Sequence, residues 1–86
     1  MKKVELFYLT YCPHCRKAFR LLEELRAKNP KYKDVVITEI NEADNKAYSD
    51  SLDYYYVPTF YVDGVKVHEG VIEESDVIRV LDSALS

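Results

Sequence analysis

The sequence has little of what several protein classes require. Its 86 residues include two glycines, three prolines, two cysteines and no tryptophan. No apolar run approaches the roughly 20 residues that a membrane-spanning helix needs. The opening stretch "MKKVELFYL" contains Glu5 and is followed by no small-residue cleavage site, so it does not fit a signal peptide. We therefore expect a cytoplasmic protein with no membrane partner.

A cluster of charges of one sign is also missing. The chain has 12 Lys and Arg against 15 Asp and Glu, for a net charge of −3, and the two signs are interspersed. This argues against a nucleic-acid partner, which would need a basic face. Charged residues make up 31% and apolar residues 48%, a balance typical of globular proteins. The length predicts a single domain over residues 1–86, and we expect a monomer.

Hydrophobic patterns predict the element order β-α-β-α-β-β-α. Asp63-Gly64 is a tight-turn dipeptide and indicates a hairpin, and Ser75 is a reasonable N-cap for the last helix. A weaker helical pattern has Ala47, Tyr48 and Leu52 on its apolar side. The order implies a right-handed first β-α-β unit and an α/β fold, a four-stranded mixed sheet with helices on both faces. The expected strands are 3–9, 34–40, 58–62 and 65–69; the expected helices are 12–29, 43–52 and 75–85.

Both cysteines lie where the first strand gives way to the first helix. Cys12 and Cys15 would close too short a loop to act as a structural staple. If Cys12 is the N-cap and Pro13 the first helical residue, free N–H groups and the helix dipole favour a thiolate at Cys12. Cys15 then returns to the same side of the helix. The spacing predicts a disulfide that opens and closes.

The predicted chemistry is thiol–disulfide exchange. The Cys12 thiolate attacks a substrate disulfide, and Cys15 then attacks Cys12 and releases the reduced substrate. A protonated His14 would add positive charge beside the thiolate, and Arg16 would add to the positive potential. We expect Tyr11, directly before Cys12, to be exposed and to contact a partner.

The motifs together resemble the thioredoxin/glutaredoxin superfamily. "CPHC" after a strand, "VPTF", the Asp-Gly hairpin and a C-terminal helix occur in the family's order, and the length is similar to that of glutaredoxins. The resemblance implies a thioredoxin-like fold, with Cys12 as nucleophile, Cys15 as resolving thiol and Pro58 as a cis-proline facing them. The Val57 backbone would then be open to strand addition by a substrate.

The resemblance also implies the cofactor and partners. We expect no bound cofactor beyond the Cys12–Cys15 disulfide itself, with protein disulfides as substrates and a flavoprotein or glutathione system as the upstream reductase. Thioredoxins have a buried acid where this chain has Leu6. Glutathione-binding glutaredoxins have Gly-Gly followed by an acid, where this chain has Glu69-Gly70. The bulk and charge of Glu69 argue against glutathione use.

Two alternatives stay open at this stage. Cys12 and Cys15 could hold half of a zinc or iron–sulfur site, with imidazole available only from His14 and His68, or with the site shared between two chains. The direction of electron flow is also open: the Pro-His dipeptide resembles periplasmic oxidases, whereas a cytoplasmic location favours a reductant or electron carrier. Tyr54, Tyr55 and Tyr56 fit core and recognition roles equally well.

Overall fold

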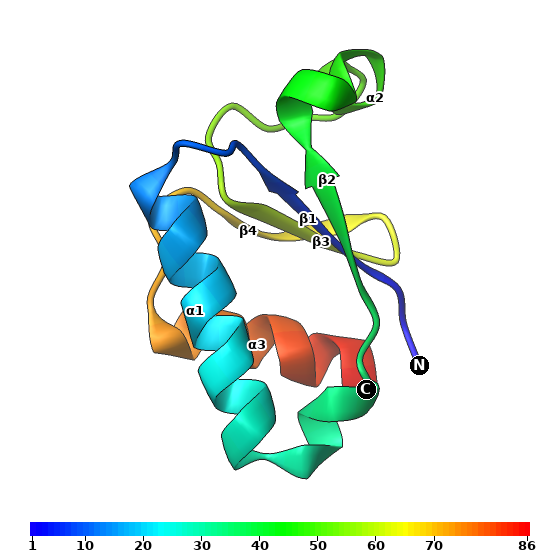
Figure 1. Ribbon diagram of the computed structural model, residues 1–86. Helices are drawn as coiled ribbons and strands as arrows, with labels where there is room; N and C mark the ends of the chain where they lie inside the picture. Colours follow the sequence, from blue (N-terminus) through cyan, green and yellow to red (C-terminus); the bar gives the residue numbers. More distant parts are fainter.

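The computed structural model describes residues 1–86 and confirms the predicted order of strands and major helices (Figure 1). The strands are β1 (Val4–Tyr8), β2 (Ile37–Asn41), β3 (Thr59–Val62) and β4 (Val65–Glu69). The helices are α1 (Pro13–Lys28), α2 (Lys46–Asp50) and α3 (Glu74–Leu85), with short 3-10 helices η1 (Pro30–Asp34) and η2 (Glu42–Asp44). None of these helices combines the length and the apolarity needed to cross a bilayer.

The four strands form one mixed sheet in the order β2-β1-β3-β4. β1 runs parallel to β2, to which α1 connects it, and antiparallel to β3, which pairs antiparallel with β4. Asp63 and Gly64 have φ values of 47° and 80°, so the predicted tight turn joins β3 to β4. This topology brings the ends of β1 and β2 and the start of β3 to one edge of the sheet.

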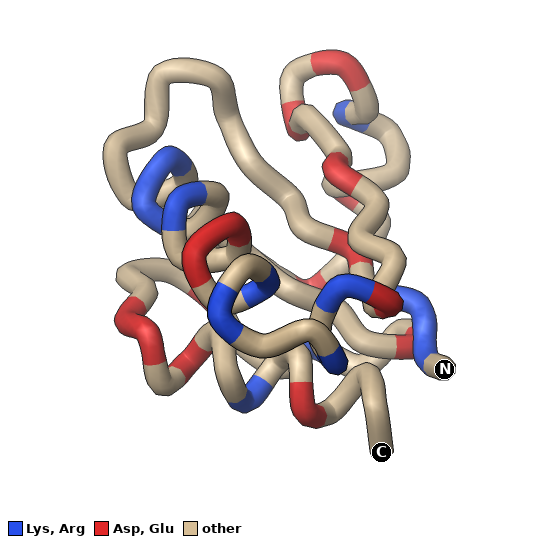
Figure 2. The backbone as a smooth tube through the Cα atoms, turned by 60° about the horizontal axis from the view of Figure 1, so that its bottom comes forward, with Lys and Arg blue, Asp and Glu red and all other residues tan.

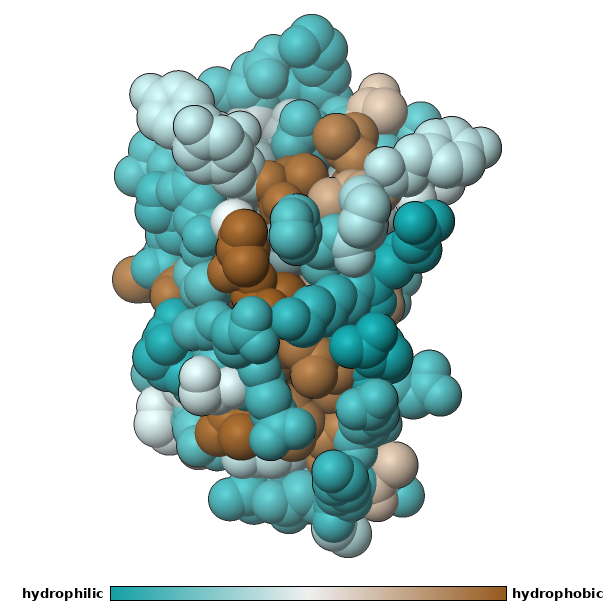
Figure 3. Space-filling model, turned by 90° about the vertical axis from the view of Figure 1, so that its left-hand side faces the viewer, coloured by the Kyte–Doolittle hydropathy of each residue, from teal (hydrophilic) through white to brown (hydrophobic).

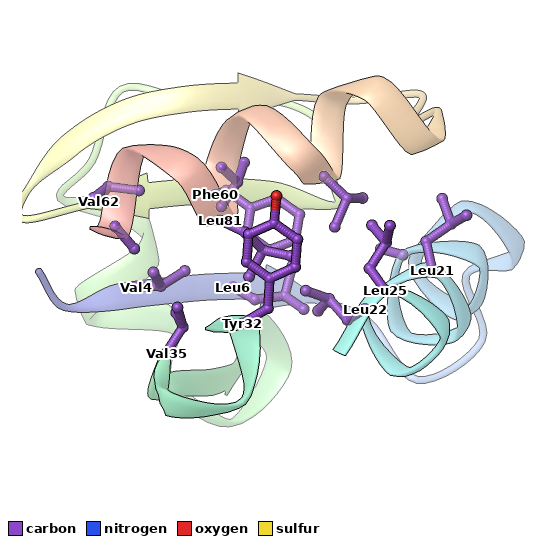
Figure 4. Close-up of a cluster of buried hydrophobic side chains, with 14 of the residues drawn as sticks. Val4, Leu6, Leu21, Leu22, Leu25, Tyr32, Val35, Phe60, Val62 and Leu81 are labelled. Atoms are coloured by element: carbon purple, nitrogen blue, oxygen red, sulfur yellow. The ribbon is translucent and has the colours of Figure 1, made fainter. Parts of the chain in front are cut away.

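The main core lies between the sheet and the pair α1 and α3. Figure 4 shows its side chains converging from both layers, with the ring of Tyr32 among them. Tyr32 also donates its hydroxyl to Asp82 Oδ1 at 2.7 Å, which connects η1 to α3. The core therefore holds α1 against the sheet. Its labelled members are Val4, Leu6, Leu21, Leu22, Leu25, Tyr32, Val35, Phe60, Val62 and Leu81.

A smaller, aromatic cluster covers the opposite face of the sheet. The Phe7 ring centroid lies 5.1 Å from that of Tyr54 and 5.6 Å from that of Tyr61. Each buried tyrosine donates its hydroxyl to a carboxylate, Tyr54 to Glu42 at 3.0 Å and Tyr61 to Asp53 at 2.8 Å. Burial and then the Asp53 contact raise the pKa of Tyr61 to about 12. These bonds satisfy the polar ends of rings that are otherwise packed as apolar groups.

The second helical segment differs from the prediction. Instead of one helix over 43–52, the chain forms η2 and the single short helix α2. Ala47 and Tyr48 are exposed, and Ser49 is the buried residue of α2. The Ser49 hydroxyl donates to the Lys46 carbonyl at 3.2 Å, so a small polar side chain is buried without an unpaired group.

The start of the second strand and the cap of the last helix also differ from the prediction. The second strand begins at Ile37 and not at Asp34: η1 ends at Asp34, and Val35 and Val36 connect it to β2 without regular structure. The last helix is capped by Glu73 and not by Ser75: Asp76 Oδ2 accepts from the Glu73 N–H at 2.9 Å, and the Asp76 N–H donates to the Glu73 carbonyl at 3.0 Å. His68 is half-buried beside this cap, with Nε2 2.8 Å from the Val71 carbonyl oxygen, although the alternating pattern of β4 predicted a solvated side chain.

Basic and acidic positions are interspersed along the chain (Figure 2). Several of them pair with each other across or along elements. Lys17 Nζ lies 3.1 Å from Glu73 Oε1 and connects α1 to the start of α3. Arg20 pairs with Glu24 one turn along α1 at 3.6 Å. Exposed pairs of this kind contribute about 0–1 kcal/mol each, so the core carries most of the stability.

We predict that Phe60→Ala destabilises the protein by about 3–5 kcal/mol, because Phe60 is fully buried in the main core and its removal leaves a cavity. Urea unfolding followed by circular dichroism measures the change. Val65→Ala is the matched control, since Val65 is 66% exposed on β4, and it should shift the free energy of unfolding by no more than about 0.5 kcal/mol. Equal effects of the two changes would contradict this assignment of the core.

Candidate active site

The start of α1 positions the first cysteine. Cys12 is the N-cap, with an extended backbone (φ −116°, ψ 111°), and Pro13 is the first helical residue. The Cys15 N–H donates to Cys12 Sγ at 3.1 Å. The predicted cap is therefore formed, and a sulfur atom takes the place that a hydroxyl or carboxylate oxygen usually has. A negative charge on that sulfur would be stabilised by the N–H group and by the helix dipole.

The two thiols differ in their access to solvent. Both are free; Cys12 is half-buried, whereas Cys15 is only 1% exposed. Both sit in the first turn of α1, which the core holds in place. A disulfide in another molecule can therefore reach Cys12, and Cys15 is reached only through Cys12.

The segment before β3 forms the other side of the site. The Val57–Pro58 peptide bond is cis. Cys12 Sγ lies 3.9 Å from the Val57 carbonyl oxygen, a geometry in which a protonated thiol donates weakly to that oxygen. The Gly70 N–H donates to the Pro58 carbonyl at 2.8 Å, so the end of β4 supports this segment. Val57, which is 45 positions after Cys12 in the chain, is thus placed beside the Cys12 sulfur.

Burial is the main reason that the pKa of Cys15 is raised. Burial first, then the hydrogen bond with Cys12 and the charge at Cys12, raise the pKa of the Cys15 thiol to about 12. Cys15 is therefore a neutral thiol at neutral pH. The two contributions from Cys12 would be lost once Cys12 is bonded to another sulfur. The pKa of Cys15 would then be lower.

Glu42 is a residue near the thiols that the sequence reasoning missed. Its carboxylate accepts from Tyr54 and adds a small electrostatic contribution to the raised pKa of Cys15. No acid is available at Leu6, which is fully buried in the main core. Glu42 follows directly after β2, and the meeting of parallel strand ends at one sheet edge was the signal that could have identified it.

The remaining expected site residues lie on the surface around Cys12. Tyr11 is 90% exposed, and Pro13, His14 and Arg16 are exposed as well. No hydrogen bond or ion pair joins His14 or Arg16 to either thiol. These residues lie on the surface around Cys12 and make no hydrogen bond or ion pair with its sulfur. Their roles in binding and catalysis remain predictions.

The three consecutive tyrosines divide between the two roles that the sequence left open. Tyr54 is buried in the aromatic cluster, whereas Tyr55 and Tyr56 are 89% and 70% exposed. The two exposed rings belong to the segment that leads to Val57. Tyr54 therefore covers the sheet, and its two neighbours are available to a partner.

A shallow hollow lies beside the exposed thiol. It has a volume of about 360 Å³. On its polar side, Asn41 Nδ2 donates to Thr10 Oγ1 at 3.0 Å. On the side of the molecule that carries the start of α1, apolar atoms are visible as patches within a mainly hydrophilic surface (Figure 3). The hollow is lined by Leu9, Thr10, Tyr11, Cys12, Asn41 and Ala43.

The donor set for a metal ion is incomplete within this chain. No three His, Cys, Asp or Glu side chains are placed so that they could hold a metal ion together. His68 belongs to β4, and its imidazole contacts the Val71 carbonyl at 2.8 Å and Asp76 of α3 at 3.7 Å, not the cysteines. The four ligands of a closed zinc site are therefore not assembled.

Comparison with known sequences gives two matches. A family model described as Glutaredoxin matches residues 4–67. A protein disulfide-isomerase of Ricinus communis is 29% identical over 80 residues, which are 93% of this chain and 16% of that protein. The chain thus spans only a small part of the length of this relative.

Solved structures share the fold. An oxidised thioredoxin from Plasmodium falciparum superposes with a TM-score of 0.72 at 17% identity, covering 99% of this chain and 82% of that one. A mutant thioredoxin from Halobacterium salinarum gives a TM-score of 0.70 at 22% identity, covering 99% and 75%. The predicted thioredoxin-like fold, with a mixed four-stranded sheet and three helices, is confirmed.

We predict that Cys15 resists alkylation at neutral pH. In a Cys12→Ser variant, the rate of Cys15 modification by iodoacetamide should rise about tenfold per pH unit above neutrality and keep rising beyond pH 9.0, the ordinary thiol value, because burial still raises the pKa of Cys15 and only the thiolate reacts. Mass spectrometry across a pH series measures this rate. The urea-unfolded variant is the control, with a midpoint near the ordinary thiol value of 9.0. A similar midpoint in the folded variant would refute the effect of burial.

Proposed function

Since the chain belongs to the glutaredoxin family, we propose that it is a thiol–disulfide oxidoreductase that cycles Cys12 and Cys15 between a dithiol and a disulfide. The observation that carries this proposal is the bond from the Cys15 N–H to Cys12 Sγ at 3.1 Å. It places both cysteines in one helical turn and points a donor at the sulfur that has to carry negative charge. The similarity to a protein disulfide-isomerase supports the same class of chemistry.

The first step uses the accessible sulfur. The Cys12 thiolate attacks one sulfur of a substrate disulfide, forms a mixed disulfide and releases the other substrate sulfur as a thiolate, which takes a proton from water. The Val57 backbone beside Cys12 offers an extended substrate segment a strand to pair with. Tyr11 and Arg16 are exposed around the same sulfur and are proposed substrate contacts.

The second step uses the buried sulfur. Cys15 loses its proton and attacks Cys12 Sγ, which forms the Cys12–Cys15 disulfide and releases the second substrate sulfur as a thiolate. Two electrons have then passed from the protein to the substrate. The loss of the Cys12 hydrogen bond and charge lowers the pKa of Cys15, which supports an order in which Cys12 reacts first.

We propose protein disulfides as substrates and the reducing direction, with two electrons returned by an upstream flavoprotein or glutathione system. The proposed setting is the cytoplasm, where thiols are kept reduced. Glu69, where glutathione-binding relatives have glycine, supports a protein substrate over glutathione. The metal-binding alternative has no complete donor set within the chain to support it.

The experiment that tests the proposal compares two single-cysteine variants. Cys12→Ser should lose the reduction of insulin disulfides by about 10³-fold or more, because no accessible thiolate remains. Cys15→Ser should retain the first step and accumulate a mixed disulfide with the substrate, since nothing resolves it. Turbidity follows insulin reduction, and non-reducing electrophoresis detects the trapped adduct.

Arg26→Gln serves as the control, because Arg26 lies near the far end of α1 and bonds only to the Lys33 carbonyl. It should retain the activity of the unchanged protein. Full activity in Cys12→Ser, or the absence of an adduct in Cys15→Ser, would overturn the proposed mechanism.

A further inference from the structure

The carboxylate of Glu69 is bound to the loop beside the active cysteine. Glu69 is the last residue of β4, and its Oε2 accepts from the Tyr55 N–H at 2.6 Å and from the Tyr56 N–H at 3.0 Å. Its Oε1 lies 2.8 Å from Lys66 Nζ. One side chain thus satisfies two consecutive backbone donors that no strand partner reaches.

Lys66 connects the same carboxylate to the start of the loop. Its ammonium group donates to the Asp53 carbonyl at 2.7 Å as well as to Glu69. The Lys66 bond and the two backbone N–H groups lower the pKa of Glu69 to about 2, from an ordinary 4.5. In the folded protein the carboxylate keeps its charge and these bonds until the pH approaches 2, so the stability that they contribute is present above pH 4.5 and is lost as the pH falls from 4.5 to 2. Glu69 is therefore fully charged at neutral pH.

The loop that Glu69 holds has no regular structure of its own. Between α2 and β3 the backbone N–H groups of Tyr55 and Tyr56 meet only this carboxylate, and both side chains point to solvent. The next residue is Val57, whose carbonyl oxygen lies 3.9 Å from Cys12 Sγ. A loop of this kind loses conformational freedom whenever a partner orders it, unless the protein has already fixed it.

We propose that Glu69 is a positioning residue for protein substrates, which fixes the loop so that Tyr55, Tyr56 and the Val57 backbone are presented to an extended substrate segment beside Cys12. Tyrosine rings give large contact areas at a low cost in conformational entropy, which suits them to this surface. Glu69 does not touch the reacting sulfur atoms, and it acts only through the loop. This inference rests on the proposed oxidoreductase function.

Two kinds of disulfide should respond differently to the loss of Glu69. A protein substrate has to pair with Val57 and pack against the tyrosines, so it benefits from a fixed loop. A small neutral disulfide needs only the Cys12 thiolate. Loss of Glu69 should therefore weaken the binding of protein substrates and leave the chemistry of the thiols unchanged.

The test uses Glu69→Ala and Glu69→Gln in the otherwise unchanged chain. In Glu69→Ala the KM for insulin should rise about tenfold or more, because hydrogen bonds to a charged group are lost, with kcat within about twofold. Glu69→Gln keeps one acceptor oxygen and should recover part of the loss. The rate with bis(hydroxyethyl) disulfide and the redox potential of the Cys12–Cys15 couple should stay the same in both variants.

Glu74→Gln is the matched control, since Glu74 is an exposed acid at the start of α3. It should leave the KM for insulin unchanged. Lys66→Met provides a second route should Glu69→Ala fold poorly: it removes one partner of the carboxylate and should raise the KM in the same direction by a smaller factor.

Two results would overturn the inference. An unchanged KM for insulin in Glu69→Ala would show that the loop needs no carboxylate. An equal loss with insulin and with the small disulfide, or a shifted redox potential, would show that Glu69 acts on the thiols. Failure of the unchanged protein with both disulfides would instead refute the proposed function itself.

Discussion

The site depends on one hydrogen bond, from the Cys15 N–H to Cys12 Sγ at the first turn of α1. This bond exists because Pro13 starts the helix directly after Cys12, which leaves the N–H groups of the first turn without backbone partners. A sulfur in the cap position receives one of those donors. The rest of the fold keeps that turn in place: α1 packs against the sheet through the main core, and Lys17 connects it to the cap of α3.

The asymmetry between the two thiols follows from the same geometry. The cap residue of a helix lies at its end, where a partner can reach it, whereas a residue three positions on lies within the first turn and against the sheet. Cys12 is therefore half-buried and Cys15 almost fully buried. Burial, together with the hydrogen bond and charge of Cys12, raises the pKa of Cys15 and keeps its thiol protonated at neutral pH.

The opposite side of the site is built from parts of the chain that are distant in sequence. Val57 and Pro58 meet Cys12 because β3 pairs with β1, and Gly70 and Glu69 support them because β4 pairs with β3. Backbone N–H groups meet two kinds of acceptor there. The Pro58 carbonyl accepts from Gly70, and the Glu69 carboxylate accepts from Tyr55 and Tyr56. The hairpin thus acts as a support for the loop that faces the thiols, and not only as the edge of the sheet.

Local patterns in the sequence determined the element order, the Asp63-Gly64 turn, the cap at Cys12 and the return of Cys15 to the same side of the helix, since each depends on neighbouring residues alone. The helical spacing of the apolar residues indicated that Cys15 is the more buried thiol; only the tertiary structure decided the exposure of Tyr55 beside the buried Tyr54 and the binding of Glu69 to a loop 14 residues away. It also decided that Ser49 is buried in place of Ala47. Desolvation and side-chain partners are set by what packs from other elements, and spacing along one chain carries no information about that packing.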